Sequence, residues 1–150
     1  MRTRTRIRGA LSRVLFEEEA SIQLKTKVQL AIAAAADRKA EDPVALNLKG
    51  IATFTDCFVI VGGSQRRQTQ AICDAVIERL AEKGQHPGHV EGYNLGDWIL
   101  IDYADLVVHV FTRETREFYG LENLWGDAPR MALAGPQNRR NRGASAARKG

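Results

Sequence analysis

The sequence has few cysteines and no long hydrophobic run. Its 150 residues include two cysteines, Cys57 and Cys73, which lie in apolar segments and lack C-x-x-C spacing. Isolated cysteines of this kind are typical of buried thiols in a reducing compartment and do not suggest a disulfide-stapled secreted scaffold. No apolar run approaches the roughly eighteen residues that a membrane span needs. We therefore expect a bacterial cytoplasmic protein with no membrane partner.

The common signatures of nucleotide-binding and hydrolytic enzymes are also missing. The sequence contains no P-loop, no G-x-G-x-x-G fingerprint and no G-x-S-x-G elbow. The stretch from Gly62 to Ser64 does resemble the start of a nucleotidyltransferase signature, but those enzymes hold two metal ions with alternating carboxylates on a strand. Here Asp74 stands alone, and Asp102 and Asp105 are three residues apart in a turn. We expect no catalytic residues and no cofactor, and a nucleotidyltransferase-type enzyme is the less favoured alternative.

The three histidines do not form a metal-binding pattern. His86 and His89 flank a Pro-Gly pair, and no second pair of ligands follows at the spacing of a zinc site. We expect no metal site. His109 interrupts an apolar strand, where it is either a hydrogen-bonded core residue or a polar contact within a docking surface.

The positive charge lies at the two ends of the chain. Residues 1–27 carry seven Lys or Arg and three Glu, residues 137–150 carry five Lys or Arg and no acid, and residues 28–136 have a net charge of −5. A nucleic-acid-binding domain normally carries its basic residues on the folded body. Any contact with rRNA is therefore expected from the two basic tails. The alternative is that the tails are surrounded by water and bind no RNA. Residues 1–20 also resemble an organellar presequence, which leaves an organellar matrix as the less favoured location.

Hydrophobic periodicity predicts one domain over residues 24–135, between a disordered basic extension over residues 1–23 and a disordered basic tail over residues 136–150. Helices are predicted at residues 24–40, 65–83 and 113–119, the second with Ser64 as its N-cap. Strands are predicted at residues 44–48 and 58–61, with a loop or short edge strand at residues 85–91.

The segment from Gly92 to Phe118 contains two further apolar runs, residues 98–101 and 106–111, joined by a four-residue turn. This pattern predicts a β-hairpin. Neither run alternates cleanly between apolar and polar residues, so we expect both strands to be covered on both faces. Together the elements predict an α/β (α+β) fold with a mixed sheet of about five strands and helices mainly on one face. What covers the second face is then the main question.

Several stretches resemble the ribosomal silencing factor family, also called Iojap-like, in residue order and spacing. The matching stretches are Thr55 to Ile60, Arg67 to Ile72, Glu91-Gly92, Gly96 to Phe111 and Arg116 to Ala128. The resemblance covers about residues 26–128. It implies a nucleotidyltransferase-like topology without the catalytic acids, which agrees with the missing D-x-D pair. Cys57 stands where the family often has Tyr, and the turn around Ser64 departs from the more usual Thr-Ser-Ser-like sequence.

The resemblance also implies a partner and a mode of action. Proteins of this family bind the large ribosomal subunit through universal large-subunit ribosomal protein fourteen and block joining of the small subunit, which represses translation when nutrients are short. A large-subunit assembly factor that uses the same surface is the alternative, because both roles need only the same docking contact. A homodimer of the free protein is a further expectation, since an uncovered apolar sheet face seldom stays bare in water.

We predict that the hairpin supplies the partner-binding surface, with aromatic and apolar anchors at its centre and carboxylates at its rim. The acidic rim would steer the protein toward a basic ribosomal partner. Strand periodicity puts Trp98 and Leu100 on one face and Ile99 and Ile101 on the other, and does not say which face is exposed. The residues predicted to bind the partner are Asp97, Trp98, Leu100, Asp102, Tyr103, Asp105, Val107 and His109.

Overall fold

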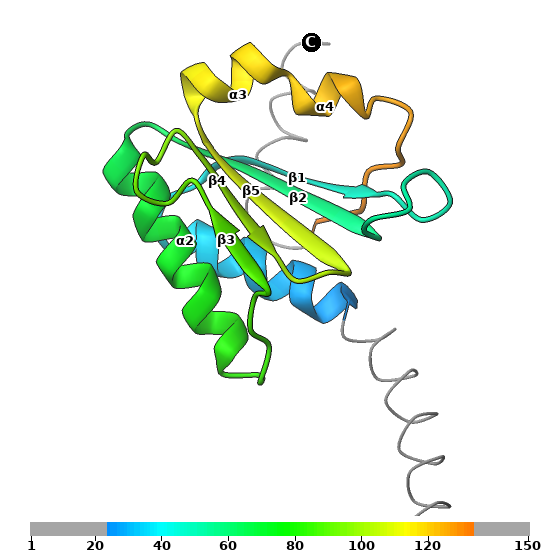
Figure 1. The fold of residues 1–150 in the computed structure, drawn as a ribbon, viewed down its shortest axis with the longest axis horizontal. Coiled ribbons are helices and arrows are strands. Elements are labelled where there is room, and N and C mark those ends of the chain that lie inside the picture. The colour runs from blue at the N-terminus through cyan, green and yellow to red at the C-terminus, as the bar shows by residue number, and fades with distance from the viewer. Residues whose placement is uncertain (1–23, 134–150) are drawn as a thin grey trace, which may run out of the picture.

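The computed structural model describes residues 24–133, which form one five-stranded mixed sheet with helices on both sides (Figure 1). The strands lie in the order β1-β2-β5-β4-β3. The elements are an N-terminal helix over residues 24–37, β1 (Glu41–Asn47), β2 (Cys57–Gly63), α2 (Arg66–Ala81), β3 (His89–Glu91), β4 (Trp98–Asp102), β5 (Leu106–Thr112), α3 (Arg113–Tyr119) and α4 (Leu121–Leu124). The predicted α/β fold with a mixed sheet of about five strands is confirmed.

The two central strands, β2 and β5, are parallel, and the other strand pairs are antiparallel. Every residue of β2 and of β5 is buried. Strands buried on both faces read as continuous apolar runs, which explains why these two segments do not alternate in sequence. In β4 the residues alternate between buried and half-buried, so the expectation that residues 98–101 are fully covered on both faces is wrong. Only the side that carries Ile99 and Ile101 is fully buried.

The two long helices cover one face of the sheet. The N-terminal helix and α2 lie below the sheet in Figure 1. Helix α2 places Ile72, Val76 and Leu80 four residues apart, on one side of the helix, where they pack with Val59 and Val108 of the sheet. This is the larger of the two hydrophobic clusters, and we refer to its side of the sheet as the helix side.

The opposite face is only partly covered, by the two short helices. After β5 the chain turns at Thr112, and α3 and α4 lie above the sheet in Figure 1. Leu121 and Trp125 pack there against a second cluster that includes Phe58, Ile60 and Phe111. Leu124 does not join this cluster, and its side chain is 74% exposed. The chain's own short helices therefore supply part of the second cover and leave the rest open.

The two edges of the sheet differ. A returning segment pairs with the outer edge of β1, where Asn47 N–H donates to the Pro129 carbonyl and Met131 N–H donates to the Ala45 carbonyl, both at 2.8 Å. The other edge is β3, a three-residue strand whose residues are all exposed. A strand this short offers few backbone groups to a neighbouring chain.

The predicted N-cap of α2 is wrong. The N-cap residue is Gln65, without a side-chain capping bond, and the helix begins at Arg66. Ser64 instead donates its backbone N–H and its hydroxyl to Gln68 Oε1, at 2.7 and 2.9 Å. Gln68 is the third residue of the helix, and its side chain reaches back to the preceding turn, as the glutamine of a capping box does.

None of the helices within residues 24–133 is long and apolar enough to cross a membrane. The predicted basic extension, presequence and basic tail lie outside the described residues, so the expectations for them stay predictions.

Candidate docking face

The pairing of β4 with β5 places most of the predicted docking residues on one face. Trp98 lies opposite Phe111, Leu100 opposite His109, and Asp102 opposite Val107. Paired residues of an antiparallel ladder share a face of the sheet. Ile99 and Ile101 point into the helix-side core. Sequence periodicity did not say which side of the sheet these residues face. The structure shows that Trp98 and Leu100 lie on the side of α3 and α4.

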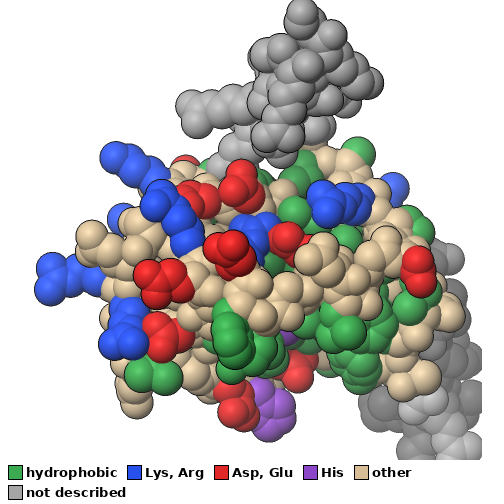
Figure 2. All heavy atoms as spheres, turned by 90° about the horizontal axis from the view of Figure 1, so that it is seen from above, with side chains coloured by type: hydrophobic (Ala, Val, Ile, Leu, Met, Phe, Trp, Pro, Cys, Tyr) green, Lys and Arg blue, Asp and Glu red, His purple; other side chains and the backbone are tan. Residues whose placement is uncertain are grey.

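Aromatic rings collect on this side from segments far apart in the chain. We call this surface the aromatic face, and it comprises Phe54, Trp98, Leu100, Phe118, Tyr119, Leu124 and Trp125, which lie over the buried ring of Phe58. Phe118 is 81% exposed and Tyr119 is 52% exposed. Figure 2 looks onto this side and shows hydrophobic side chains gathered in groups with acidic side chains beside them. Large exposed apolar patches bordered by polar residues commonly mark protein interfaces.

His109 lies beneath this surface as a core residue. Trp98 Nε1–H donates to His109 Nδ1 at 3.1 Å, which fixes Nδ1 as the acceptor and places the imidazole proton on Nε2. The Nε2 atom is buried and has no hydrogen-bond partner among the described residues. Burial lowers the pKa of His109 from 6.5 to about 4. The histidine thus orients the Trp98 indole from below, and the first of the two sequence interpretations, a hydrogen-bonded core residue, describes its position.

The three carboxylates predicted for the rim are all held by contacts within the chain. Asp97 accepts two hydrogen bonds from the guanidinium of Arg66, at 2.8 and 3.2 Å. Asp102 accepts the backbone N–H of Ala104 in the hairpin turn. Asp105 pairs with Lys27 of the N-terminal helix at 2.9 Å. Asp105 therefore fastens the hairpin turn to a helix on the far side of the sheet, which makes it a structural residue.

Tyr103 belongs to the core of the helix side and not to the aromatic face. It is 7% exposed and packs in the cluster formed with the N-terminal helix and α2. Burial is the main reason that the pKa of its phenol is raised. Val107 lies on the same side as Trp98 but is also buried. The surface positions expected for Tyr103 and Val107 are therefore wrong, because Tyr103 is buried with the N-terminal helix and α2 and Val107 is buried in the second cluster, beside Phe58 and Phe111.

Replacing Tyr103 with Phe tests this placement. The Tyr103 hydroxyl is buried without a partner among residues 24–133, and an unpaired buried hydroxyl lowers stability. We expect Tyr103→Phe to leave the free energy of unfolding unchanged or to raise it by up to about 1 kcal/mol. Urea unfolding measures this change. A clear loss of stability would show that the hydroxyl is bonded, and a loss of large-subunit binding would return Tyr103 to the docking surface.

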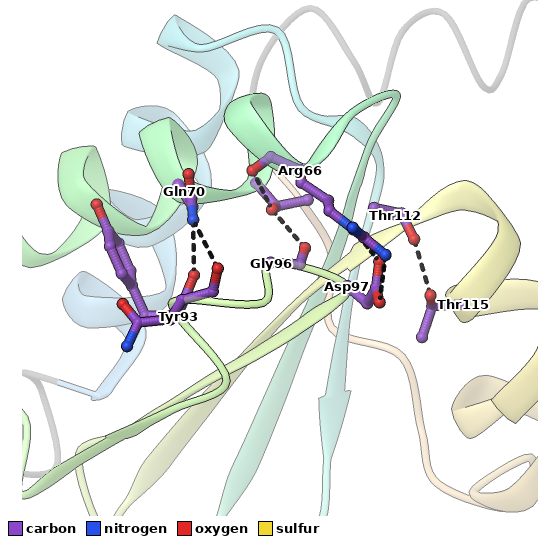
Figure 3. A network of polar contacts seen from close by, with 9 residues as sticks. Arg66, Gln70, Tyr93, Gly96, Asp97, Thr112 and Thr115 are labelled. Atoms are coloured by element: carbon purple, nitrogen blue, oxygen red, sulfur yellow. Dashed lines mark hydrogen bonds and ion pairs between the residues drawn. The ribbon is translucent and has the colours of Figure 1, made fainter.

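The loop before β4 is fastened to α2, and this fixes the position of Asp97 and Trp98 (Figure 3). Thr69 donates its hydroxyl to the Gly96 carbonyl at 2.6 Å, and Gln70 donates its side-chain amide to the Tyr93 carbonyl at 2.8 Å. At Gly92, φ is +77°, and a Cβ atom would lie 2.1 Å from the Trp98 carbonyl oxygen. Only glycine permits so close an approach of the two backbone segments.

The glycine turn that suggested a nucleotidyltransferase is occupied by the protein's own side chains. Gln68 accepts from the Ser64 backbone N–H, and a Cβ at Gly62 would lie 3.3 Å from Nη1 of Arg116. That guanidinium donates to the carbonyls of Glu41 and Asp42 and pairs with a carboxylate of α4. A backbone amide already bonded inside the chain is not available to a phosphate group.

The cysteines and other potential ligands offer no chemistry at this face. Cys57 and Cys73 are free and buried, and burial raises the pKa of each thiol to about 12. Within residues 24–133 no three His, Cys, Asp or Glu side chains are grouped so that they could hold a metal ion. A thiol with so high a pKa is a poor nucleophile. Both cysteines serve as packing residues in the helix-side core.

Sequence reasoning missed several residues of the aromatic face. Phe54 comes from the loop after β1, Phe118 and Tyr119 come from α3, and Trp125 follows α4. Their rings meet: Tyr119 lies 4.8 Å from Trp98, and Trp125 lies 5.9 Å from Phe58, between ring centroids. A signal was present in the sequence, because Phe118 and Tyr119 are adjacent aromatic residues on a helix too short to bury both.

Comparisons with known proteins agree with the resemblance found in the sequence. The family described as ribosomal silencing factor during starvation matches residues 21–150. A ribosomal silencing factor from Halalkalibacterium halodurans is 46% identical over 108 residues, which cover 72% of this chain and 92% of that protein. A crystal structure from Bacillus halodurans has a TM-score of 0.65 at 42% identity and covers 73% of this chain and 99% of the other.

A more distant relative carries a different name. The mouse protein called mitochondrial assembly of ribosomal large subunit protein 1 is 27% identical over 107 residues, which cover 69% of this chain and 47% of that protein. The family match extends over far more than half of this sequence. The alignment with the Halalkalibacterium protein covers 92% of that protein. This chain therefore belongs to the ribosomal silencing factor family.

Proposed function

We propose that this protein binds the large ribosomal subunit through its aromatic face and, by occupying that position, blocks joining of the small subunit. The partner on the subunit is universal large-subunit ribosomal protein fourteen. The protein acts in the cytoplasm as a repressor of translation, by steric occlusion and without catalytic turnover or a cofactor.

The observation that carries the proposal is the exposed aromatic face. Trp98, Tyr119 and Phe118 lie together over the sheet, with Trp98 half-buried and fixed by His109. Aromatic anchors of this kind, held in place and surrounded by polar groups, are the usual energetic centres of protein interfaces. The net charge of −5 on residues 28–136 favours approach to a basic ribosomal protein.

Sedimentation of ribosomes tests this function directly. Purified protein added to separated subunits under joining conditions is expected to migrate with the large subunit and to shift the profile from joined ribosomes to free subunits. The small subunit alone should not carry the protein. If the protein fails to migrate with the large subunit, the ribosomal proposal is overturned.

A role in assembly of the large subunit is the second candidate, and the name of the mouse relative is what favours it. Both roles use the same docking contact, but an assembly factor binds the large subunit at an earlier time than a silencing factor does. Depletion of the protein separates them: an assembly factor leaves incomplete large-subunit particles, whereas a silencing factor leaves normal particles and raises the fraction of joined ribosomes. Accumulated precursors on depletion would favour assembly.

A homodimer of the free protein stays a prediction. If two copies pair through the aromatic face, the dimer and the large-subunit complex exclude each other. Binding measured over a range of protein concentrations would then show apparent affinity falling as the dimer forms.

A further inference from the structure

A groove of about 530 Å³ lies between the loop before β4 and helix α3, at one end of the aromatic face. Its lining includes two carboxylate residues and four apolar or aromatic ones. They are Leu95, Asp97, Trp98, Glu114, Phe118 and Tyr119. Because Trp98, Phe118 and Tyr119 also belong to the aromatic face, the groove is continuous with the surface proposed to dock.

The two carboxylates of the groove differ in whether they have a partner within the chain. Asp97 lies at the rim of the groove and already accepts two hydrogen bonds from the guanidinium of Arg66, which approaches from α2 (Figure 3). The Glu114 carboxylate forms no hydrogen bond and no ion pair within residues 24–133, although its charge acts on Arg66 from a longer distance. Arg66 cancels one of the two negative charges, so the groove keeps a net negative charge at Glu114.

The bond between Arg66 and Asp97 uses both oxygens of the Asp97 carboxylate. Two nitrogens of one guanidinium reach both oxygens of the carboxylate, the two-point arrangement that distinguishes arginine from lysine. The Asp97 carboxylate is therefore already occupied, and a second cation that enters the groove meets the Glu114 carboxylate instead.

Aromatic rings form the other walls. The ring centroids of Trp98 and Tyr119 are 4.8 Å apart, and those of Phe118 and Tyr119 are 5.1 Å apart. Guanidinium groups stack on such rings, and the methylene stem of an arginine packs on apolar side chains such as Leu95. Exposed aromatic walls beside an unpaired carboxylate thus match both parts of an arginine side chain.

We propose that this groove receives an arginine side chain of the basic protein partner, with the guanidinium between Glu114 and the aromatic rings. The identity of the partner rests on the proposed function, but the chemistry of the groove does not. An arginine inserted here would fix the orientation of the partner on the aromatic face.

The groove can be tested without ribosomes, by NMR titration of the full-length protein with N-acetyl-arginine amide. We expect saturable shifts of the Trp98 indole N–H and of the α3 amides, with a dissociation constant in the millimolar range that suits a single side chain. N-acetyl-citrulline amide has the same length and no charge, and should bind roughly tenfold more weakly because it lacks the charge-assisted contact.

Two variants on the same helix provide the matched comparison. Glu114→Gln removes the free charge of the groove and should weaken arginine binding several-fold. Glu117→Gln removes an exposed charge of α3 that does not line the groove, and should have no effect. Equal binding of arginine and citrulline amides, or equal affinities of the two variants for arginine amide, would overturn the proposal.

Binding to purified large subunits separates the groove from the proposed function. We expect Glu114→Gln to lose affinity for the subunit by roughly tenfold relative to Glu117→Gln. If both variants bind the subunit equally well, the partner does not use the groove and the inference fails while the proposed function stands. If the unaltered protein binds arginine amide but no large subunit, the proposed function fails instead.

Discussion

Replacing Trp98 with Ala is expected to weaken binding to the large ribosomal subunit by about 30- to 1,000-fold, the loss typical of a central aromatic anchor of an interface. The indole packs on Phe111 at 5.0 Å and on Tyr119 at 4.8 Å between ring centroids, and its nitrogen is bonded to His109. The indole is thus held rigidly within the aromatic face, so little conformational freedom is lost when a partner covers it.

The variant must be shown to fold, because Trp98 also contributes to packing. Circular dichroism and urea unfolding check this directly. Tyr119→Ala provides a second approach, since this side chain is half-exposed and its loss should weaken binding with little cost to stability.

Val90→Ala is the matched control, because Val90 is an exposed apolar residue that pairs with Ile101 and so lies on the helix side of β3. If folded Trp98→Ala and Tyr119→Ala proteins bind the subunit as tightly as Val90→Ala does, the aromatic face is not the docking surface.

The second large effect concerns acid stability and His109. Its pKa is about 4 in the folded protein, below the ordinary 6.5 that the unfolded chain should show, because the imidazole is buried. Between these values the unfolded chain binds a proton that the folded protein does not. Stability from this residue is therefore fully present above about pH 6.5 and falls as the pH is lowered toward 4, by up to about 3 kcal/mol.

The hydrogen bond to Trp98 reinforces this direction. Nδ1 accepts the indole N–H, so a proton on Nδ1 would remove the acceptor and place two N–H groups against each other. Urea unfolding at several values between pH 7.5 and pH 4.5 measures the slope. His109→Phe removes the titrating group and keeps a ring among Phe58, Trp98 and Phe111, so its stability should fall less steeply with acid.

His89→Asn is the control for this experiment. His89 is exposed on β3, so its imidazole stays in water whether or not the chain is folded. This variant should keep the slope of the unaltered protein. Equal slopes for the unaltered protein and His109→Phe would contradict the prediction.

The local pattern of the sequence predicted the hairpin and the partition of its side chains, because both depend on neighbours along the chain. The same alternation also held the signal for Tyr103, since residues 99, 101 and 103 fall on one side of the sheet. Tyr103 directly follows β4 and keeps the alternation of that strand, so its position next to the turn does not expose it.

The remaining features depend on contacts between distant segments. Asp105 pairs with Lys27, which is 78 positions away, and nothing near Asp105 in sequence announces that partner. The aromatic face likewise assembles from the loop after β1, from β4 and from α3. The strand pattern does not predict which side of the hairpin is exposed. That side depends on where α3 and α4 lie after the chain leaves β5.

The parallel pairing of β2 with β5 also governs the order in which the sheet can form. Cys57 is paired with Leu106, so nearly fifty residues separate the partners of the central ladder. Closing so long a loop loses chain entropy before any ladder bond forms, and such non-local pairing slows folding. During synthesis β2 has to wait until β5 has left the ribosome, and the apolar central strands remain vulnerable to aggregation for that interval. The central ladder of the sheet can therefore close only after synthesis has passed Thr112, the last residue of β5.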